Sequence, residues 1–185
     1  DAAPRDLTDT VGVRARVGYG GGDFSVGAEC AVFADQESGR LMRVPLTGGL
    51  PAPVTPAFGK FASPAISPDG RHVLFVNSTE RKDVIGIVDI EGHHWPQIIA
   101  SGHDFFMQPA WSNDGLRVTW IAWDHPNMPW DGARAWVADV QLRDGRLPEL
   151  KAAPRCIAGG DAIAASQPSF TRDGSSLILI SDTNG

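Results

Sequence analysis

One short motif occurs three times along the sequence and limits the folds that the chain can adopt. Each copy begins with a proline, at Pro64, Pro109 and Pro168, and continues to an Asp-Gly pair and a run of apolar residues. The Asp-Gly pair favours a tight turn in which glycine takes a positive φ. The apolar run after it indicates a strand that is buried on both faces. The motif therefore predicts repeated hairpins, at intervals of 45 and 59 residues.

Further strands are expected around these copies, because short apolar segments bounded by turn residues flank them. The earliest of these segments form a degenerate additional copy of the unit. In chain order the segments are residues 23–26, 30–34, 41–46 and 52–56 before the first copy, 84–90 and 96–100 after it, and 135–140 and 154–158 after the second. Four strands in a period of about 45 residues are typical of a β-propeller blade.

The predicted fold is therefore all-β, a propeller fragment with about three four-stranded blades and the start of a fourth. We expect residues 1–18 to form an N-terminal extension or an outer strand. The expected blades cover approximately residues 19–58, 59–102, 103–161 and 162–185, the last of them incomplete. No segment combines a period of 3.6 with helix caps, so no long helix is expected. Because an open propeller exposes strand edges, we expect a longer parent protein or self-association through those edges.

Composition argues against several classes of function. The net charge is -6 and no Lys/Arg run occurs, which argues against nucleic-acid binding. No apolar stretch approaches the roughly 20 residues of a membrane span, and the first residues lack the features of a signal peptide. Cys30 and Cys156 are too few for a disulfide framework. We therefore expect two reduced, buried thiols and a cytoplasmic protein.

An insertion over residues 124–132 distinguishes the second copy of the motif from the other two. It follows the second strand of its blade, so it lies on the propeller face that also carries the loops entering each first strand. One interpretation is that its polar and aromatic side chains line a substrate cavity or a domain interface, where a carboxylate would pair with the free α-amino group of a peptide. The alternative is a rigid loop in which Trp plugs the blade and Asp caps turns. The candidate side chains are those of Asp124, His125, Asn127, Trp130 and Asp131.

Two aromatic positions complete the set of candidates. Tyr19 lies in a loop expected on the same face as the insertion. The adjacent Phe105 and Phe106 enter the third blade, and neighbouring strand residues point to opposite sides. One of the two is expected in the core and the other toward the tunnel or cavity, and Phe106 is retained as a candidate.

No cofactor or metal is predicted. His93-His94 and His103-Asp104 match no standard metal-ligand spacing, and a turn at Gly92 accounts better for the first pair. The glycines at 20–22 lack the Gly-Lys-Ser/Thr ending of a phosphate loop, so they more simply allow the chain to pass close to the propeller axis.

Three stretches carry a resemblance to a known family: residues 13–24, the Ser-Pro-Asp-Gly motif at 67–70, and residues 123–132. The chain resembles the N-terminal β-propeller part of prolyl oligopeptidase-family serine peptidases, most closely the acylaminoacyl-peptidase and dipeptidyl-aminopeptidase-like bacterial branch. The resemblance implies a parent exopeptidase or oligopeptidase. It also implies a C-terminal α/β-hydrolase domain that carries catalysis, with the propeller covering the active site and restricting access of peptide substrates.

Catalytic residues are not predicted within these 185 residues. They contain no Gly-x-Ser-x-Gly nucleophile elbow, so no position matches the family's catalytic serine.

Two other functions remain open. The Ser-Pro-Asp-Gly motif also occurs in Tol-system propellers, which are not enzymes and bind a protein partner. A carbohydrate-active or lectin-like propeller is the third possibility, although the spacing of carboxylates and aromatic residues does not require it.

Overall fold

The computed structural model describes residues 3–9, 11–19, 22–80 and 82–183. Strands account for all of the regular structure, and the described residues contain no helix, so none of them forms a helix able to span a membrane. This confirms the all-β prediction. The strands are β1 (Phe24–Val26), β2 (Cys30–Ala34), β3 (Leu41–Pro45), β4 (Ala52–Pro53), β5 (Lys60–Ile66), β6 (His72–Ser78), β7 (Asp83–Asp89), β8 (Gln97–Ala100), β9 (Phe105–Trp111), β10 (Arg117–Trp123), β11 (Arg134–Gln141), β12 (Glu149–Leu150), β13 (Arg155–Gly159), β14 (Ala165–Phe170) and β15 (Leu177–Ser181).

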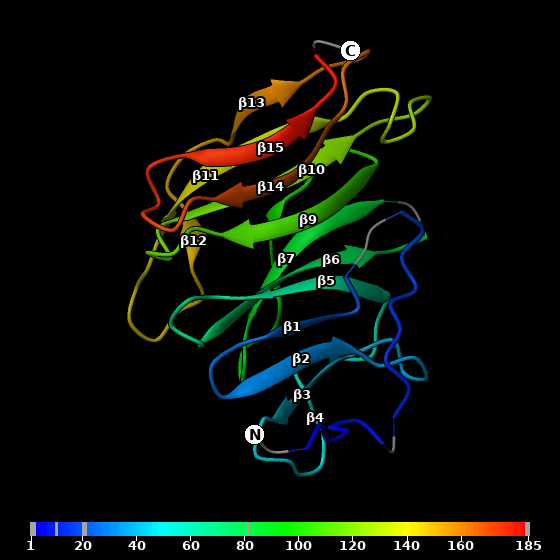
Figure 1. The fold of residues 1–185 in the computed structure, drawn as a ribbon, viewed down its shortest axis with the longest axis vertical. Helices are drawn as coiled ribbons and strands as arrows, with labels where there is room; N and C mark the ends of the chain where they lie inside the picture. The colour runs from blue at the N-terminus through cyan, green and yellow to red at the C-terminus, as the bar shows by residue number, and fades with distance from the viewer. Residues whose placement is uncertain (1–2, 10, 20–21, 81, 184–185) are drawn as a thin grey trace.

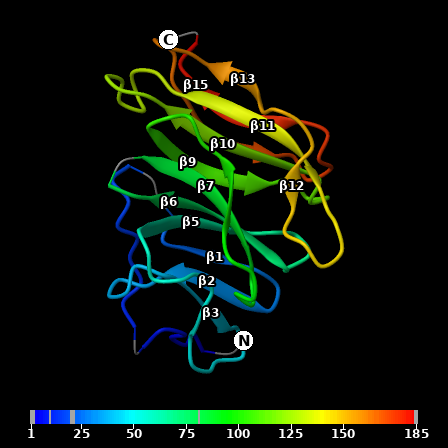
Figure 2. The ribbon, with the colours of Figure 1, turned by 180° about the vertical axis from the view of Figure 1, so that it is seen from behind.

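The strands form successive antiparallel sheets in chain order, as a partial β-propeller requires (Figure 1). The first sheet has the order β1-β2-β3-β4 and the second β5-β6-β7-β8. The third contains β9-β10-β11, with β13 as its fourth strand and the short β12 also paired with β11. The hairpin β14-β15 starts a fourth sheet. Strands β1, β5, β9 and β14 pack next to one another as the inner strands. The sheets follow one another from the first sheet at the bottom to the last strands at the top in both views (Figure 2).

The Asp-Gly turns between the first two strands are nearly identical in all three copies. In the second copy, the Ser112 hydroxyl donates to Asp114 Oδ1 at 2.5 Å and accepts the Arg117 N–H at 2.9 Å. The glycines have φ values of 69–71°, which explains why only glycine fits well. In the first copy, burial by itself raises the pKa of Asp69, but hydrogen bonds from Ser67 and Arg71 outweigh it and lower the pKa to about 2. These turns formed as predicted because the hydrogen bonds that close each turn are local.

A β-bulge interrupts the inner strand of each copy, directly before the motif's proline. Ser63, Gln108 and Gln167 have φ values of 49°, 54° and 52°, and the pairing register shifts there in all three sheets. Positive φ is unfavourable for residues other than glycine. Contacts with the neighbouring sheet stabilise the bulges: Gln108 Oε1 accepts the Gln167 N–H at 2.7 Å, and the Ser63 N–H donates to the Gly22 carbonyl at 2.8 Å.

The core consists of layers between successive sheets. The largest layer joins the second and third sheets and includes Leu74, Val76, Phe106 and Trp120, each at most 2% exposed. A second layer joins the first and second sheets, and a third joins the third sheet to the β14-β15 hairpin. Each sheet is therefore stabilised by the sheets beside it rather than by a core of its own.

The N-terminal segment packs along the outer side of the first sheet. Leu7, Val11 and Val13 cover the buried cluster that contains Phe33, and Val13 forms one isolated bridge with Asp35. Within the described residues, this segment contributes no strand to a blade.

The expectation that both cysteines are buried was wrong. Cys30 is half-buried and Cys156 is exposed, because β13 is the outer strand of its sheet. Both thiols are free, and burial raises the pKa of the Cys30 thiol.

Candidate functional site

The insertion connects β10 to β11 and begins where the pairing of β9 with β10 ends. Phe105 pairs with Trp123 in this antiparallel ladder. Continuing the register by one residue places Asp104 opposite Asp124. The sequences His103-Asp104 and Asp124-His125 therefore run past each other in opposite directions, which brings each histidine close to the carboxylate of the other strand.

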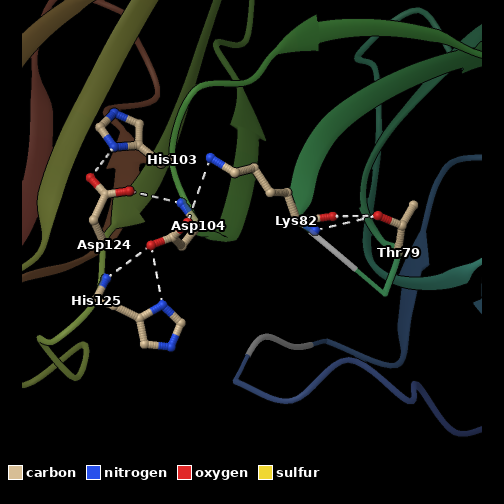
Figure 3. Close-up of polar contacts among 6 residues, drawn as sticks. All are labelled: Thr79, Lys82, His103, Asp104, Asp124 and His125. Atoms are coloured by element: carbon tan, nitrogen blue, oxygen red, sulfur yellow. Dashed lines mark hydrogen bonds and ion pairs between the residues drawn. The ribbon is translucent and has the colours of Figure 1, made fainter.

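These four residues form a reciprocal pair of His–Asp contacts, which we call the His–Asp clamp (Figure 3). Asp124 Oδ2 lies 2.7 Å from His103 Nδ1, and Asp124 Oδ1 accepts the Asp104 N–H at 2.8 Å. In the other direction, Asp104 Oδ2 accepts the His125 N–H at 3.1 Å and lies 3.1 Å from His125 Nδ1. The start of the insertion is thus fixed to the segment that enters the third blade.

The clamp continues into the second blade. Lys82 Nζ lies 3.7 Å from Asp104 Oδ1 (Figure 3). The Asp83 N–H donates to the Asp104 carbonyl at 3.2 Å. Hydrogen bonds from the His125 N–H and ring, with a smaller contribution from the charge on Lys82, hold the pKa of Asp104 below its usual value. Asp104 is therefore ionised at neutral pH. His103 packs between Phe106 and Trp136, so the clamp is also joined to the core.

An aromatic cluster lies beside the clamp. Phe105 stacks on Trp123 with centroids 5.1 Å apart, and Tyr19 meets both rings edge-on at 5.5 and 5.9 Å. The His125 ring lies 4.8 Å from Phe105, and the Tyr19 hydroxyl reaches the Met128 sulfur at 3.5 Å. Tyr19 thus joins the loop that precedes the first blade to the insertion. Offset and edge-on aromatic pairs of this kind fix side chains in position.

The sequence left open which of Phe105 and Phe106 enters the core, and Phe106 was retained as a candidate for the cavity side. It is 1% exposed and belongs to the core between the second and third sheets, so it faces no cavity. Phe105 is the half-buried member of the pair. Alternation along the strand predicts that the two rings diverge, but it does not show which of them enters the core.

The far end of the insertion is fixed to the segment that enters the β14-β15 hairpin. Asn127 Nδ2 donates to the Asp161 carbonyl at 2.8 Å, and Arg134 pairs with the Asp161 carboxylate at 2.6 Å. Gly132 passes so close to the Asp161 carbonyl that a Cβ would collide with it. Asn127 therefore acts as an anchor in this structure, and only glycine fits at position 132.

Asp131 and Trp130 differ in their surroundings. Asp131 Oδ2 accepts the Met128 N–H at 3.1 Å, which caps the turn within the insertion. Trp130 has no aromatic neighbour among the described residues and is 64% exposed. A large apolar side chain held on a fixed loop is suited to contacting another molecule or domain.

The side chains that the site exposes are suited to binding. They are the His125 ring, whose Nδ1 contacts Asp104, the Trp130 indole, and the Asp131 carboxylate, one oxygen of which accepts the Met128 N–H. Among the described residues, no group of three His, Cys, Asp or Glu side chains is arranged to hold a metal ion. His93 and His94 instead lie in a turn that Asp89 caps, because its carboxylate accepts their N–H groups at 3.1 and 2.7 Å.

Two cavities lie away from the insertion. One of about 890 Å³ lies between the turns at Asp69-Gly70 and Asp144-Gly145, and one of about 340 Å³ lies at the outer rim, near Trp95. Neither is lined by a residue of the insertion.

Comparison with solved structures gives the strongest evidence of relationship. A puromycin-hydrolyzing peptidase of Mycobacterium tuberculosis matches 97% of this chain at 31% identity, with a TM-score of 0.78. A mutant puromycin hydrolase complexed with PGG matches 97% at 30% identity, with a TM-score of 0.79. This chain spans 30% of the length of each of these peptidases.

A putative TolB from Agrobacterium tumefaciens matches 82% of this chain and 53% of its own length, at 21% identity and a TM-score of 0.58, which shows a shared fold alone. No family model and no curated protein matches the sequence. The peptidase match extends over nearly the whole chain. The chain therefore matches a propeller segment of the prolyl oligopeptidase family of serine peptidases.

Proposed function

We propose that this chain is the non-catalytic propeller segment of a serine peptidase, where it covers the active site of a C-terminal α/β-hydrolase domain and gates or helps bind peptide substrates. The observation that carries the proposal is the match to puromycin-hydrolysing peptidases over 97% of the chain. The relative lengths agree with the proposal, because this chain covers only 30% of the length of those peptidases and so corresponds to one segment of them.

The geometry of the insertion supports a role at the boundary with the hydrolase domain. A gating loop must keep its shape when the neighbouring domain moves, because a loose loop admits water and misplaces the substrate. The insertion is held by the His–Asp clamp at one end and by Asp161 at the other. Trp130 projects from this fixed loop into solvent. We assign to Trp130 and Asp131 the contact with substrate or with the hydrolase domain.

The test uses the full polypeptide that contains this chain. Trp130→Ala should raise KM for aminoacyl or peptidyl chromogenic substrates several-fold, because an exposed aromatic anchor at a binding surface carries a large share of the contact energy. The rate of inactivation by a small serine-directed reagent should stay unchanged, because such a reagent does not need the propeller contacts.

Trp95→Ala is the matched control, since Trp95 is 70% exposed but lies at the outer rim beside Phe58. It should leave KM and the inactivation rate at their wild-type values. The proposal fails if Trp130→Ala and Trp95→Ala have the same effect on KM, or if the full polypeptide shows no serine-dependent peptide hydrolysis.

A further inference from the structure

One half-buried arginine lacks the acceptor that the other half-buried arginines have. Among the residues that the structure describes, three half-buried arginines donate to or pair with a protein acceptor: Arg43 with Glu91, Arg117 with the Gly174 carbonyl, and Arg134 with the Asp161 carboxylate. Arg40 is also half-buried, but its guanidinium has no hydrogen-bond or ion-pair partner among the described residues, and its Nε is fully buried. An unpaired charge away from bulk water is unfavourable, so this position favours an anion supplied by another molecule.

Arg40 lines the cavity of about 340 Å³ at the outer rim. One wall belongs to the first sheet and consists of Arg40 with residues 53–56, and the other consists of residues 92–95, in the loop between β7 and β8. His93 and His94 belong to this second wall, and no aspartate or glutamate lines the cavity. The chain as a whole has a net charge of -6. An arginine and two histidines without a carboxylate are therefore a local exception, and they are complementary to an anion.

Asp89 is the carboxylate that contacts this wall, and it is already engaged. It accepts the N–H groups of His93 and His94, and its Oδ2 lies 3.0 Å from His94 Nδ1. Asp89 lines the larger cavity rather than this one. It therefore holds the two histidines in place and offsets the charge of His94, but it leaves Arg40 without a counter-charge.

Trp95 gives the same cavity an aromatic wall that is fixed in position. The indole is 70% exposed, yet it stacks on Phe58 with centroids 5.6 Å apart and an interplanar angle of 15°. Phe58 in turn meets the buried Phe61 edge-on at 5.6 Å, which connects the stack to the core. A large, exposed indole that is held by such contacts is suited to receive a flat ring.

We propose that this cavity binds a small organic anion, whose carboxylate or phosphate group pairs with Arg40 and whose ring lies against Trp95. The planar guanidinium presents two parallel N–H groups that match either anion. One charged contact combined with an apolar surface is typical of small-molecule sites, and the volume lies in their range of roughly 300–1,000 Å³. The site is separate from the insertion and does not depend on the peptidase assignment.

Isothermal titration calorimetry of the full polypeptide that contains this chain tests the proposal. A serine-directed reagent is applied beforehand, so that a peptidase active site contributes no binding. Phenyl phosphate and phenylacetate carry both a ring and an anion, inorganic phosphate carries only the anion, and benzyl alcohol carries only the ring. At least one of the first two should bind with a Kd of roughly 1 mM or lower, about tenfold more tightly than either partial probe. The tighter of the two identifies the anionic group that the site prefers.

Substitutions then assign the binding to this cavity. Arg40→Gln should weaken the tighter probe at least roughly tenfold, and Arg40→Lys, which keeps the charge but not the planar fork, should fall between it and the wild type. Trp95→Ala should weaken that probe several-fold and leave the affinity for inorganic phosphate unchanged. Arg155→Gln is the matched control, because Arg155 is exposed on β13 and the variant loses the same charge. It should bind like the wild type.

Circular dichroism should show wild-type strand content for Arg40→Gln, because Arg40 has no protein partner to lose. Wild-type protein that binds neither phenyl phosphate nor phenylacetate would overturn the proposal, as would equal binding by the wild type and Arg40→Gln. A loss in Arg155→Gln as large as that in Arg40→Gln would assign the effect to overall charge and also overturn it. These results are distinct from those on KM, because the binding is measured with the serine blocked.

Discussion

Removal of the Asp124 carboxylate should loosen the insertion by a calculable amount. In Asp124→Ala, the Asp104 N–H and the His103 ring both lose their acceptor, at 2.8 and 2.7 Å in the wild type. A hydrogen bond to a charged group contributes about 1.5–3 kcal/mol when it is well buried. The Asp124 side chain is 43% exposed, so water competes for both bonds. The expected loss of unfolding free energy is therefore about 1–2 kcal/mol.

Urea unfolding measures this loss directly, since a lower midpoint at an unchanged slope reports reduced stability without a change in compactness. Asp124→Asn keeps an oxygen that accepts the Asp104 N–H but loses the charge that faces His103. It should recover about half of the loss. Hydrogen exchange at the Asp104 amide should accelerate by about tenfold in Asp124→Ala and less in Asp124→Asn.

A double-mutant cycle with His103→Ala separates the pairwise contact from the other effects of each substitution. Directly bonded residues should show a coupling energy of about 0.5–1.5 kcal/mol. A loss below about 0.3 kcal/mol in Asp124→Ala, or strict additivity with His103→Ala, would refute the clamp as a structural anchor.

Three further perturbations test other parts of the structure. Gly132→Ala should destabilise the chain by about 1–3 kcal/mol in urea unfolding, because the new Cβ collides with the Asp161 carbonyl; wild-type stability would show that the insertion is not anchored there. Asp69 and Asp173 have pKa values lowered to about 2. Their ionised forms stabilise the folded state above pH 4, and this stability should disappear as the pH falls toward 2. Asp69→Asn should flatten that acid limb in thermal melts, and an unchanged limb would contradict the turn geometry. Trp120→Ala should cost about 3–5 kcal/mol, measured by urea unfolding, because Trp120 is buried between two sheets; a loss below 1 kcal/mol would contradict that layer.

The sequence predicts the parts of this fold that depend on local chemistry. The Asp-Gly turns are closed by bonds between residues no more than five positions apart, such as Ser112 with Asp114 and with Arg117. Residue types alone therefore determine them. The strands that follow the turns are apolar on both faces because a sheet packs on each side, and the sequence shows this as an uninterrupted apolar run.

The candidate site is less accessible to sequence reasoning because its contacts are distant along the chain. Asn127 bonds to Asp161, 34 residues away, and Tyr19 reaches Met128 across 109 residues. No local pattern predicts such partners. The sequence left open which of Phe105 and Phe106 enters the core, and the structure places Phe106 there. The bulge at Gln108 depends on contacts between sheets, which a single motif does not contain.

One signal for the clamp was present in the sequence and was missed. His103-Asp104 and Asp124-His125 are reversed dipeptides at the facing ends of two paired strands. In an antiparallel ladder this order places opposite residue types side by side. His103-Asp104 was considered as a metal site, for which its spacing is unsuitable, and Asp124 and His125 were considered as residues that line a substrate cavity or a domain interface. Reversed His-Asp dipeptides that flank a predicted hairpin therefore indicate a crossed clamp.

Labelling with a fluorophosphonate probe tests the central claim most directly. The probe reacts with activated serines, which need a base and an oxyanion hole, and this chain supplies no Gly-x-Ser-x-Gly elbow. The full polypeptide should be labelled at a single serine outside these 185 residues, and the 185-residue chain alone should stay unlabelled. Labelling of the chain alone, or an unlabelled full polypeptide, would contradict its assignment as the non-catalytic propeller of a serine peptidase.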